Sequence, residues 1–347
     1  MKKIHTENTH KKYLTIKNTC DIMKVERLYN GRKERKKGDT MNAITTPNAN
    51  TLTAGGDLQN RFFSYLDVKP RTLDTYAKAL KQFFICLSCK GIQQPTREDV
   101  VAYREELKAT HKPTTVQSYI TVVKLFFRWT AQEGLYPNIA DHLKGAKIDR
   151  NHKKDYLTSK QVKNVMQGIG QDSEQGKRDY AMVALMVTGG LRTIEVARAN
   201  IEDLRTLGDY TVLYVQGKGK DEKSEYIKVN DNVERAIRAY LQARGNASPA
   251  DPLFVSTSNN SKGNRMTTRS ISAIAKTAIE NGGYKSDRLT AHSLRHTAVT
   301  LSLLAGQKLE DVQQHARHSN IATTMIYNHA LDRAKNGCSD AVAGLIF

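Results

Sequence analysis

The sequence predicts a mainly α-helical protein with a small β-hairpin, an α+β fold divided into two domains. Three observations lead to this prediction. From Leu58 onward, apolar residues recur at three- and four-residue spacing, as in helices that bury one face. Near Lys218, two β-rich runs flank a turn that contains glycines. A basic stretch without periodicity, residues 138–155, separates the two helical regions.

The size and charge of the chain narrow its class. Its 347 residues suffice for two domains of ordinary size, each with its own core. The 54 lysines and arginines exceed the 35 acidic residues and give a net charge of +19, which favours a polyanionic partner such as nucleic acid. The longest apolar run, Met182–Val187, is far shorter than the ~20 residues that span a bilayer. We therefore expect no membrane contact and a cytoplasmic, nucleoid-associated protein.

Residues 1–56 form a basic N-terminal extension and a flexible linker. Residues 1–40 contain 12 lysines and arginines against 5 acidic residues, and the polar segment after Met41 has the composition of a flexible linker. Two interpretations remain open. The extension could be an arm that grips DNA, or translation could start at Met41.

Residues 57–137 are expected to form a compact bundle of about four helices, the first over Leu58–Leu66. Apolar residues between Leu73 and Phe84 repeat as one buried helical face. Thr96 is predicted to cap the next helix, with Asp99 at its third position. Another helix starts at Thr114 and stops before Gly134.

Residues 138–155 are predicted to be a basic interdomain linker. A linker of this charge could cross a DNA backbone, although a merely solvated connector fits the charge equally well. The candidate DNA-binding residues are Lys144, Lys147, Arg150, Lys153 and Lys154.

Residues 156–347 are expected to form the second domain. It begins with a capped helix in LTSKQVKNVM, and a second helix runs to Gly189 and Gly190. The runs Val212–Val215 and Tyr226–Val229 predict a hairpin. The remainder is predicted to be largely helical, over Val233–Ala243, Thr268–Glu280, Ser293–Ala305, Leu309–His315 and Asn320–Ala330.

Metal ligation is a weak interpretation of this sequence. Cys86 and Cys89 form a CxxC, but no second ligand pair follows at suitable spacing, and the helical setting favours burial of both as free thiols. His296 and His315 form spaced pairs with other histidines, yet a structural role for both is favoured. No glycine-rich phosphate loop is present. We therefore predict that the chain uses no metal and no cofactor.

A set of residues toward the C-terminus suits attack on a phosphodiester. Arginine gives paired, charge-assisted hydrogen bonds to phosphate oxygens, so Arg192 and Arg295 could replace a metal clamp. Tyr327 would be the nucleophile, because nearby positive charge eases loss of its phenolic proton. Lys218 could protonate the leaving oxygen. Each residue alone would more often be structural, so the prediction depends on the whole ordered set.

That ordered set resembles the tyrosine recombinase family, in particular the Xer-like and phage-type integrases. TGGLRTIEV resembles the first arginine box of the family, and LYVQGKGKDEKSEYIKV resembles the hairpin that carries its catalytic lysine. AHSLRHTAVT is similar to the HxLRH box, and HSNIATTMIY to the segment from histidine to tyrosine. The resemblance runs from about residue 58 to residue 332. It implies that the catalytic residues are Arg192, Lys218, His292, Arg295, His318 and Tyr327.

The resemblance also implies an architecture and a mechanism. A helical core-binding (SAM-like) domain and a catalytic domain would form a C-shaped clamp on double-stranded DNA at specific recombination sites. Tyr327 would form a 3′-phosphotyrosyl intermediate without metal or ATP, and a homotetramer would exchange strands through a Holliday junction. Such an enzyme belongs to DNA integration and to mobile elements. An accessory directionality factor is left open.

Two features distinguish this chain within the resemblance. The residue before His318 is Arg317, where the family commonly has glycine, and this adds a positive charge beside the site. The hairpin offers Lys218, Lys220 and Lys223; Lys218 matches the family position and Lys220 is the second choice. Two other functions compete, a type IB topoisomerase-like relaxing enzyme and a catalytically idle DNA-binding regulator.

Overall fold

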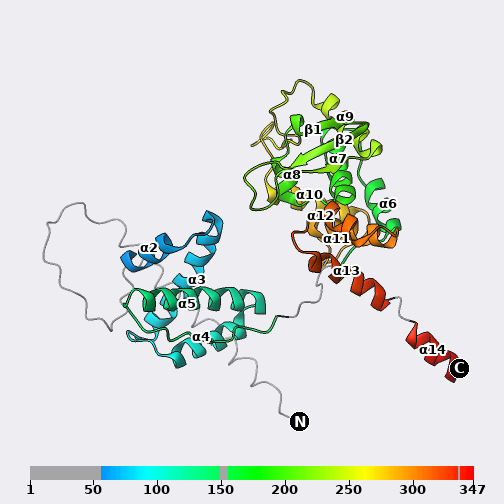
Figure 1. Ribbon diagram of the computed structural model, residues 1–347. Coiled ribbons are helices and arrows are strands. Elements are labelled where there is room, and N and C mark those ends of the chain that lie inside the picture. Colours follow the sequence, from blue (N-terminus) through cyan, green and yellow to red (C-terminus); the bar gives the residue numbers. More distant parts are fainter. Residues whose placement is uncertain (1–55, 149–154, 335–336) are drawn as a thin grey trace, which may run out of the picture. The chain divides into compact units, whose positions relative to one another are not determined.

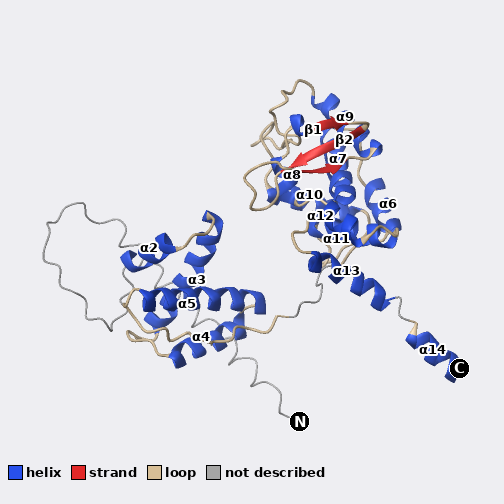
Figure 2. Cartoon of the chain, in the orientation of Figure 1, coloured by secondary structure: helices blue, strands red, loops and turns tan. Residues whose placement is uncertain are grey.

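The computed structural model describes residues 56–148, 155–334 and 337–347. Contacts between residues divide the chain into two compact units, and the boundary in the sequence falls between residues 149 and 150 (Figure 1). Helices dominate both units, and the strands lie in the second (Figure 2). The predicted class, mainly α with a small sheet, is therefore confirmed. No helix within the described ranges is both long and apolar enough to cross a bilayer.

The first unit is a helical bundle. Its helices are α2 (Gly56–Tyr65), α3 (Pro70–Cys89), α4 (Arg97–Thr110) and α5 (Pro113–Gln132). Proline occupies the first position of α3 and of α5. It suits a helix start, because an amide at that position would donate no hydrogen bond within the helix. The predicted cap of α4 is present, because the Thr96 amide donates to Asp99 Oδ2 at 2.8 Å. Edge-to-face rings fill the core, among them Phe62, Phe83, Phe84, Phe126 and Phe127.

The second unit begins with α6 (Ser159–Gln167), α7 (Glu174–Gly189) and α8 (Thr193–Arg198). After the short 3₁₀ turn η1 (Ile201–Asp203), β1 (Leu204–Leu207), β2 (Tyr210–Val215) and β3 (Glu225–Lys228) form an antiparallel sheet in the order β1-β2-β3. Leu213 pairs with Leu204 on one side and Ile227 on the other. The helices that follow are α9 (Asp231–Arg244), α10 (Thr268–Asn281), α11 (Ala291–Leu304), α12 (Leu309–Ala316), α13 (Ile321–Ala334) and α14 (Cys338–Ile346).

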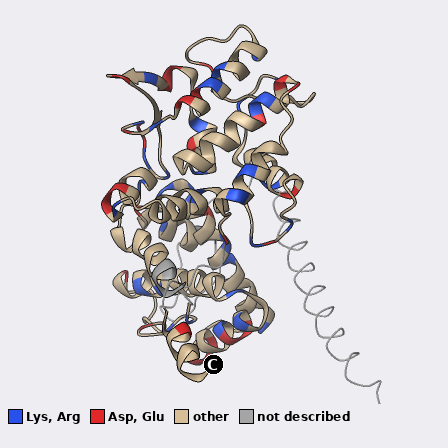
Figure 3. Cartoon of the chain, turned by 90° about the vertical axis from the view of Figure 1, so that its right-hand side faces the viewer, with Lys and Arg blue, Asp and Glu red and all other residues tan. Residues whose placement is uncertain are grey.

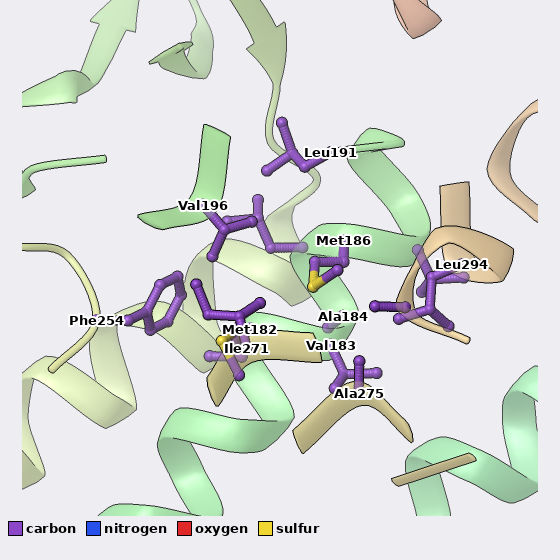
Figure 4. Packing of buried hydrophobic residues seen from close by; sticks show 14 of the residues in the cluster. Met182, Val183, Ala184, Met186, Leu191, Val196, Phe254, Ile271, Ala275 and Leu294 are labelled. Carbon is purple, nitrogen blue, oxygen red and sulfur yellow. The ribbon is translucent and has the colours of Figure 1, made fainter. Parts of the chain in front are cut away.

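Helix α7 lies at the centre of the second unit. It contacts α9, α10 and α11, and apolar residues cover it nearly all round. Figure 4 shows Met182, Val183 and Met186 of α7 packed among Ile271 of α10 and Leu294 of α11. A helix that is buried on every side gives a rigid support. The residues at its C-terminal end are therefore held in place.

The structure differs from the sequence predictions in four respects. Strand β1 and helix α8 were not predicted, because each is too short to show a period. Helix α14 was not predicted either. The expected burial of both CxxC thiols is wrong for Cys89, which is exposed at the last residue of α3. Cys86 is half-buried and donates to Glu106 Oε2 at 3.5 Å.

Candidate active site

A left-handed turn after α7 delivers Arg192 to the start of α8. Gly190 has a φ of 57°, a conformation that favours glycine, and a side chain there would press on Ala298. Arg192 is the N-cap residue of α8, and its side chain is 29% exposed. Its Nη1 donates to Glu195 Oε1 at 2.8 Å, and its amide donates to Glu195 Oε2 at 2.8 Å. Glu195 in the first turn of α8 therefore holds both the backbone and the guanidinium of Arg192 in place.

Arg295 comes from α11 and is almost completely buried, with 2% of its surface exposed. Its Nη1 donates to the Gly190 carbonyl at 2.6 Å, and its Nη2 donates to the Ala316 carbonyl. Burial lowers the pKa of Arg295, and the charges of Arg192 and Arg317 act in the same direction. These bonds join α11 to the end of α7 and to the end of α12. The two bonds use one hydrogen on each terminal nitrogen of Arg295, so the second hydrogen on each nitrogen remains for a ligand.

His318 follows the end of α12, and its ring faces α13. Its Nδ1 lies 2.9 Å from Thr324 Oγ1 of α13. Burial, followed by the charges of Arg295, Arg192, Arg317 and His292 in that order of strength, lowers the pKa of His318 to about 4. The imidazole is therefore neutral at pH 7, with one nitrogen that donates and one that accepts.

Tyr327 is buried in a small cluster with Val299, Val312 and Ala316, and only 7% of its surface is exposed. Its ring stacks on that of His318, with the centroids 6.3 Å apart. Burial raises the pKa of Tyr327 to about 12, although Arg295 and Arg192 oppose this rise. The phenol is therefore protonated at neutral pH. The two arginines are close enough to favour its ionised form.

Three other histidines lie in this region, and one of them, His296, contacts the tyrosine. His292 is exposed in the first turn of α11, with its ring edge-on to His296 at 4.6 Å. The buried His296 ring lies 5.2 Å from the Tyr327 ring. His315 Nε2 donates to the Thr188 carbonyl at 2.9 Å and so joins α12 to α7. These contacts agree with structural roles for His296 and His315.

Lys218 lies in the turn between β2 and β3 and lines a pocket of about 820 Å³. Arg192, His318 and Lys220 also line this pocket. Lys223 is different, because its Nζ pairs with the buried Asp203 at 2.6 Å. The hairpin therefore offers Lys218 and Lys220 to a ligand, while Lys223 is held by the protein.

The candidate DNA-binding lysines are only partly described. Lys144 and Lys147 are exposed after α5, whereas Arg150, Lys153 and Lys154 lie outside the described residues. The Lys144 carbonyl accepts from Arg104 Nη1 at 2.8 Å, and this bond ties the start of the linker to α4. Basic and acidic residues are interspersed along the helices and loops (Figure 3).

Arg317 has a contact that the sequence did not indicate. We expected it to add positive charge beside the site, but its guanidinium forms a buried ion pair with Glu195 at 2.9 Å. Burial alone would raise the pKa of Glu195, but Arg317 and Arg192 outweigh burial and lower it. The sequence signal at position 317 was the departure from glycine before His318.

The structure thus brings five of the six predicted residues within electrostatic reach of one another: Arg192, Arg295, His318, Tyr327 and His292. Lys218 joins them through the pocket that it shares with Arg192 and His318. The arginine charges exceed the single charge of Glu195, so the group suits an anion. With a phosphate bound there, the neutral imidazole and the phenol could take part in the transfer of a phosphoryl group to the tyrosine.

Comparison with known proteins identifies related families over both units. Residues 155–334 match the model of the phage integrase family. Residues 59–136 match the model described as phage integrase, N-terminal SAM-like domain. Two curated relatives cover most of the chain. A tyrosine recombinase of Synechocystis sp. is 28% identical over 295 residues, which are 80% of this chain and 92% of the relative. Tyrosine recombinase XerC of Herpetosiphon aurantiacus is 30% identical over 289 residues, which are 79% of this chain and 91% of the relative.

Solved structures share the fold at lower identity. The XerH recombinase bound to its difH substrate is 18% identical with a TM-score of 0.60, covering 76% of this chain and 79% of XerH. The Tn1549 transposon integrase in complex with a circular intermediate DNA is 18% identical with a TM-score of 0.62, covering 78% and 93%. The lambda integrase tetramer bound to a Holliday junction is 14% identical with a TM-score of 0.60, covering 80% and 77%.

Proposed function

This chain belongs to the phage integrase family as a tyrosine-type site-specific DNA recombinase, and we propose that Tyr327 is its nucleophile. The observation that carries the assignment is the position of the Tyr327 ring. It lies against His318 and within the field of Arg192 and Arg295. The relatives described above are recombinases and integrases, so the alternative of a type IB topoisomerase-like enzyme gains no support.

Arg192 and Arg295 bind the scissile phosphate. Each keeps unused N–H donors after its bonds within the protein, and those donors can meet the non-bridging oxygens. Attack on phosphorus gathers negative charge on these oxygens, and fixed cations stabilise that charge more than they stabilise the ground state. His318 and His292 add hydrogen bonds. The arginines supply the charge that a metal would otherwise provide, so we propose a reaction that needs neither metal nor ATP.

The transfer itself exchanges one ester for another. The Tyr327 phenol gives up its proton to His292 and its oxygen forms a bond to phosphorus, while the bond from phosphorus to the 5′ oxygen breaks. Lys218 donates a proton to that leaving oxygen and frees a 5′ hydroxyl. The 3′-phosphotyrosyl bond conserves the energy of the broken phosphodiester. A tyrosine that is 7% exposed has to move toward the pocket to react, so DNA binding must bring its hydroxyl there.

The rest of the chain binds and assembles on DNA. We assign residues 57–137 to a DNA-binding domain, 138–155 to a linker across the backbone and 156–347 to the catalytic domain. Lys144 and Lys147 would contact phosphates. A homotetramer would join two sites on nucleoid DNA, and lambda integrase is seen as a tetramer on a Holliday junction. Helix α14 and the residue after it offer apolar surface for assembly, with Val342, Leu345, Ile346 and Phe347 exposed.

A trapping experiment tests this function and also finds the unknown site. The full-length chain is incubated with a randomised duplex library in which a nick just beyond the cleavage point lets the short fragment that carries the new 5′ hydroxyl diffuse away. Adducts that resist denaturant are then recovered and sequenced. We expect adducts on one recurring sequence with the wild type and none with Tyr327→Phe. Equal recovery from the two proteins would contradict the proposal.

A further inference from the structure

Arg317 occupies a backbone position that favours glycine. It ends α12 with φ 53° and ψ 48°, in the left-handed region, directly before His318. Glycine is the usual residue at such a helix end, because a β-carbon is strained there. The described residues include one other non-glycine residue with positive φ, His142, which is exposed. A long, buried side chain at this position therefore indicates that its contacts offset the strain.

The contacts of Arg317 are all inside the protein. Its Nη1 donates to the His315 carbonyl at 2.7 Å and to the Gly189 carbonyl at 3.4 Å. Its Nη2 donates to the Gly190 carbonyl at 3.2 Å and to Glu195 Oε2 at 2.9 Å. These four bonds use all four hydrogens of the terminal nitrogens, and the remaining Nε is buried. Arg317 also lines the pocket that Lys218 shares with Arg192 and His318, but only 3% of its side chain is exposed. Because its terminal hydrogens are bonded inside the protein, we expect Arg317 to act through another residue.

That residue is Glu195. Its side chain is fully buried, and its two oxygens face two different arginines. Oε1 accepts from Arg192 Nη1, while Oε2 accepts from Arg317. Burying a carboxylate without a partner is costly. When the exposed part of Arg192 turns its charge to a phosphate, Arg317 is the buried cation that still neutralises Glu195.

We propose that Arg317 is a positioning residue that holds Glu195 as the fixed support from which Arg192 reaches the scissile phosphate. This inference rests on the proposed function. Arg317 also joins the end of α12 to the turn after α7, because its guanidinium donates to the His315 carbonyl in α12 and to the Gly190 carbonyl after α7. His318 is the next residue, so the same bonds fix the backbone that carries it.

The pH dependence of cleavage reports this role. The charged groups that face Glu195 are Arg192 at the start of α8, Arg317 at the end of α12 and Arg295 on α11. Burial raises the pKa of Glu195, and Arg317 is the strongest influence that lowers it. Without Arg317, this pKa rises, and acid then protonates the carboxyl that supports Arg192. The cleavage rate of a variant without Arg317 should therefore fall as the pH decreases, and it should fall more steeply than the cleavage rate of the wild type.

The experiment measures the rate of covalent adduct formation on the nicked substrate recovered above. Arg317→Gly suits the left-handed backbone and removes the guanidinium, while Arg317→Met keeps most of the side-chain volume. We expect adduct formation to slow at least about tenfold in each, with non-covalent DNA affinity changed by less than about twofold. The ratio of variant to wild-type rate should fall further as the pH is lowered, because the carboxyl of Glu195 then becomes protonated in the variant. In Arg317→Gly/Glu195→Gln the extra pH dependence should disappear, because the titrating group is gone.

A matched control is Arg178→Met. Arg178 is another buried arginine, paired with Asp179 at 2.7 Å and bonded to the Val255 carbonyl. Its loss should lower the unfolding temperature but leave the rate per folded molecule and its pH profile unchanged.

The outcomes separate the two proposals. A wild type that forms no adduct overturns the proposed function. An active wild type overturns the inference on Arg317 if Arg317→Gly matches it in rate and pH profile. If Arg317→Gly does not fold, the same comparison is made with Arg317→Met.

Discussion

The ring of His318 stacks on the ring of Tyr327, with the centroids 6.3 Å apart and 17° between the planes. His318 follows the end of α12, and Tyr327 lies on α13, nine positions later in the sequence. The start of α13 therefore brings the two rings together. Thr324, between them, bonds to His318 Nδ1 at 2.9 Å. The proposed nucleophile and a proposed phosphate ligand are therefore packed against each other.

The first prediction concerns the charge of His318. Its pKa should be about 4 in the DNA-free protein, against an ordinary value of 6.5, because it is half-buried among arginines. A depressed folded-state pKa means that the neutral ring favours folding above about pH 6.5. That stability is lost as the pH falls toward about 4. Nitrogen-15 NMR of labelled histidines measures the midpoint.

His318→Gln provides the control for this prediction. It should reduce the loss of unfolding temperature between about pH 6.5 and pH 4 without abolishing it. The remainder comes from His315, whose pKa burial also lowers. A midpoint for His318 at or above its ordinary value would contradict the account.

The second prediction separates the hairpin lysines. If Lys218 protonates the leaving oxygen, Lys218→Ala should slow cleavage about 100-fold or more. A substrate with sulfur in place of the 5′ bridging oxygen should restore the rate, because a thiolate leaves without protonation. Rates of adduct formation on the two substrates measure this. The matched variant Lys220→Ala should be slowed far less, and the reverse pattern would assign the role to Lys220.

The third prediction concerns Lys223, the lysine that is held by the protein. Lys223→Met would leave the buried Asp203 without its partner. We expect a loss of about 1–3 kcal/mol in the free energy of unfolding, reduced because Lys223 is partly exposed. Cleavage by the folded protein should be nearly unchanged. Chemical denaturation and adduct formation together check this, and a normal stability with slow cleavage would contradict it.

The fourth prediction concerns assembly. Removing residues 338–347 deletes the exposed apolar side chains of α14 and Phe347. We expect recombination between two sites to fall more than about tenfold, because ~25 cal/mol per Å² of apolar burial would be lost from each contact between protomers. Adduct formation on a single nicked site should change little. Full recombination by a tetramer of the shortened chain would rule out this role.

The sequence was a good guide to the helices and to the chemistry. Periodic apolar residues located α3 and α5, and Thr96 with Asp99 marked the start of α4. The order of Arg192, Arg295, His318 and Tyr327 pointed to residues that the fold does bring together. Such predictions succeed because each pattern is local or belongs to a long, regular element.

Sequence patterns could not show what depends on partners distant in the chain. Cys89 was predicted to be buried from the pattern of the helix it ends, yet its side chain is exposed. Arg317 looked like a charge beside the site, and 122 residues separate it from the carboxylate it binds. The burial of Tyr327 also arises from tertiary packing, against Val299 of α11 and Val312 of α12. Which side chain faces which is decided by packing, which no spacing rule encodes.

Locating the covalent bond tests the central claim most directly. The adduct is formed in excess EDTA on the recovered DNA, digested with trypsin and nuclease, and sequenced by mass spectrometry. Cleavage after Arg317 and Arg333 places the predicted nucleophile in the peptide of residues 318–333. We predict a nucleotide joined through its 3′ phosphate to Tyr327. A nucleotide on another residue, an adduct that persists in Tyr327→Phe, or a strict requirement for Mg²⁺ would contradict the account.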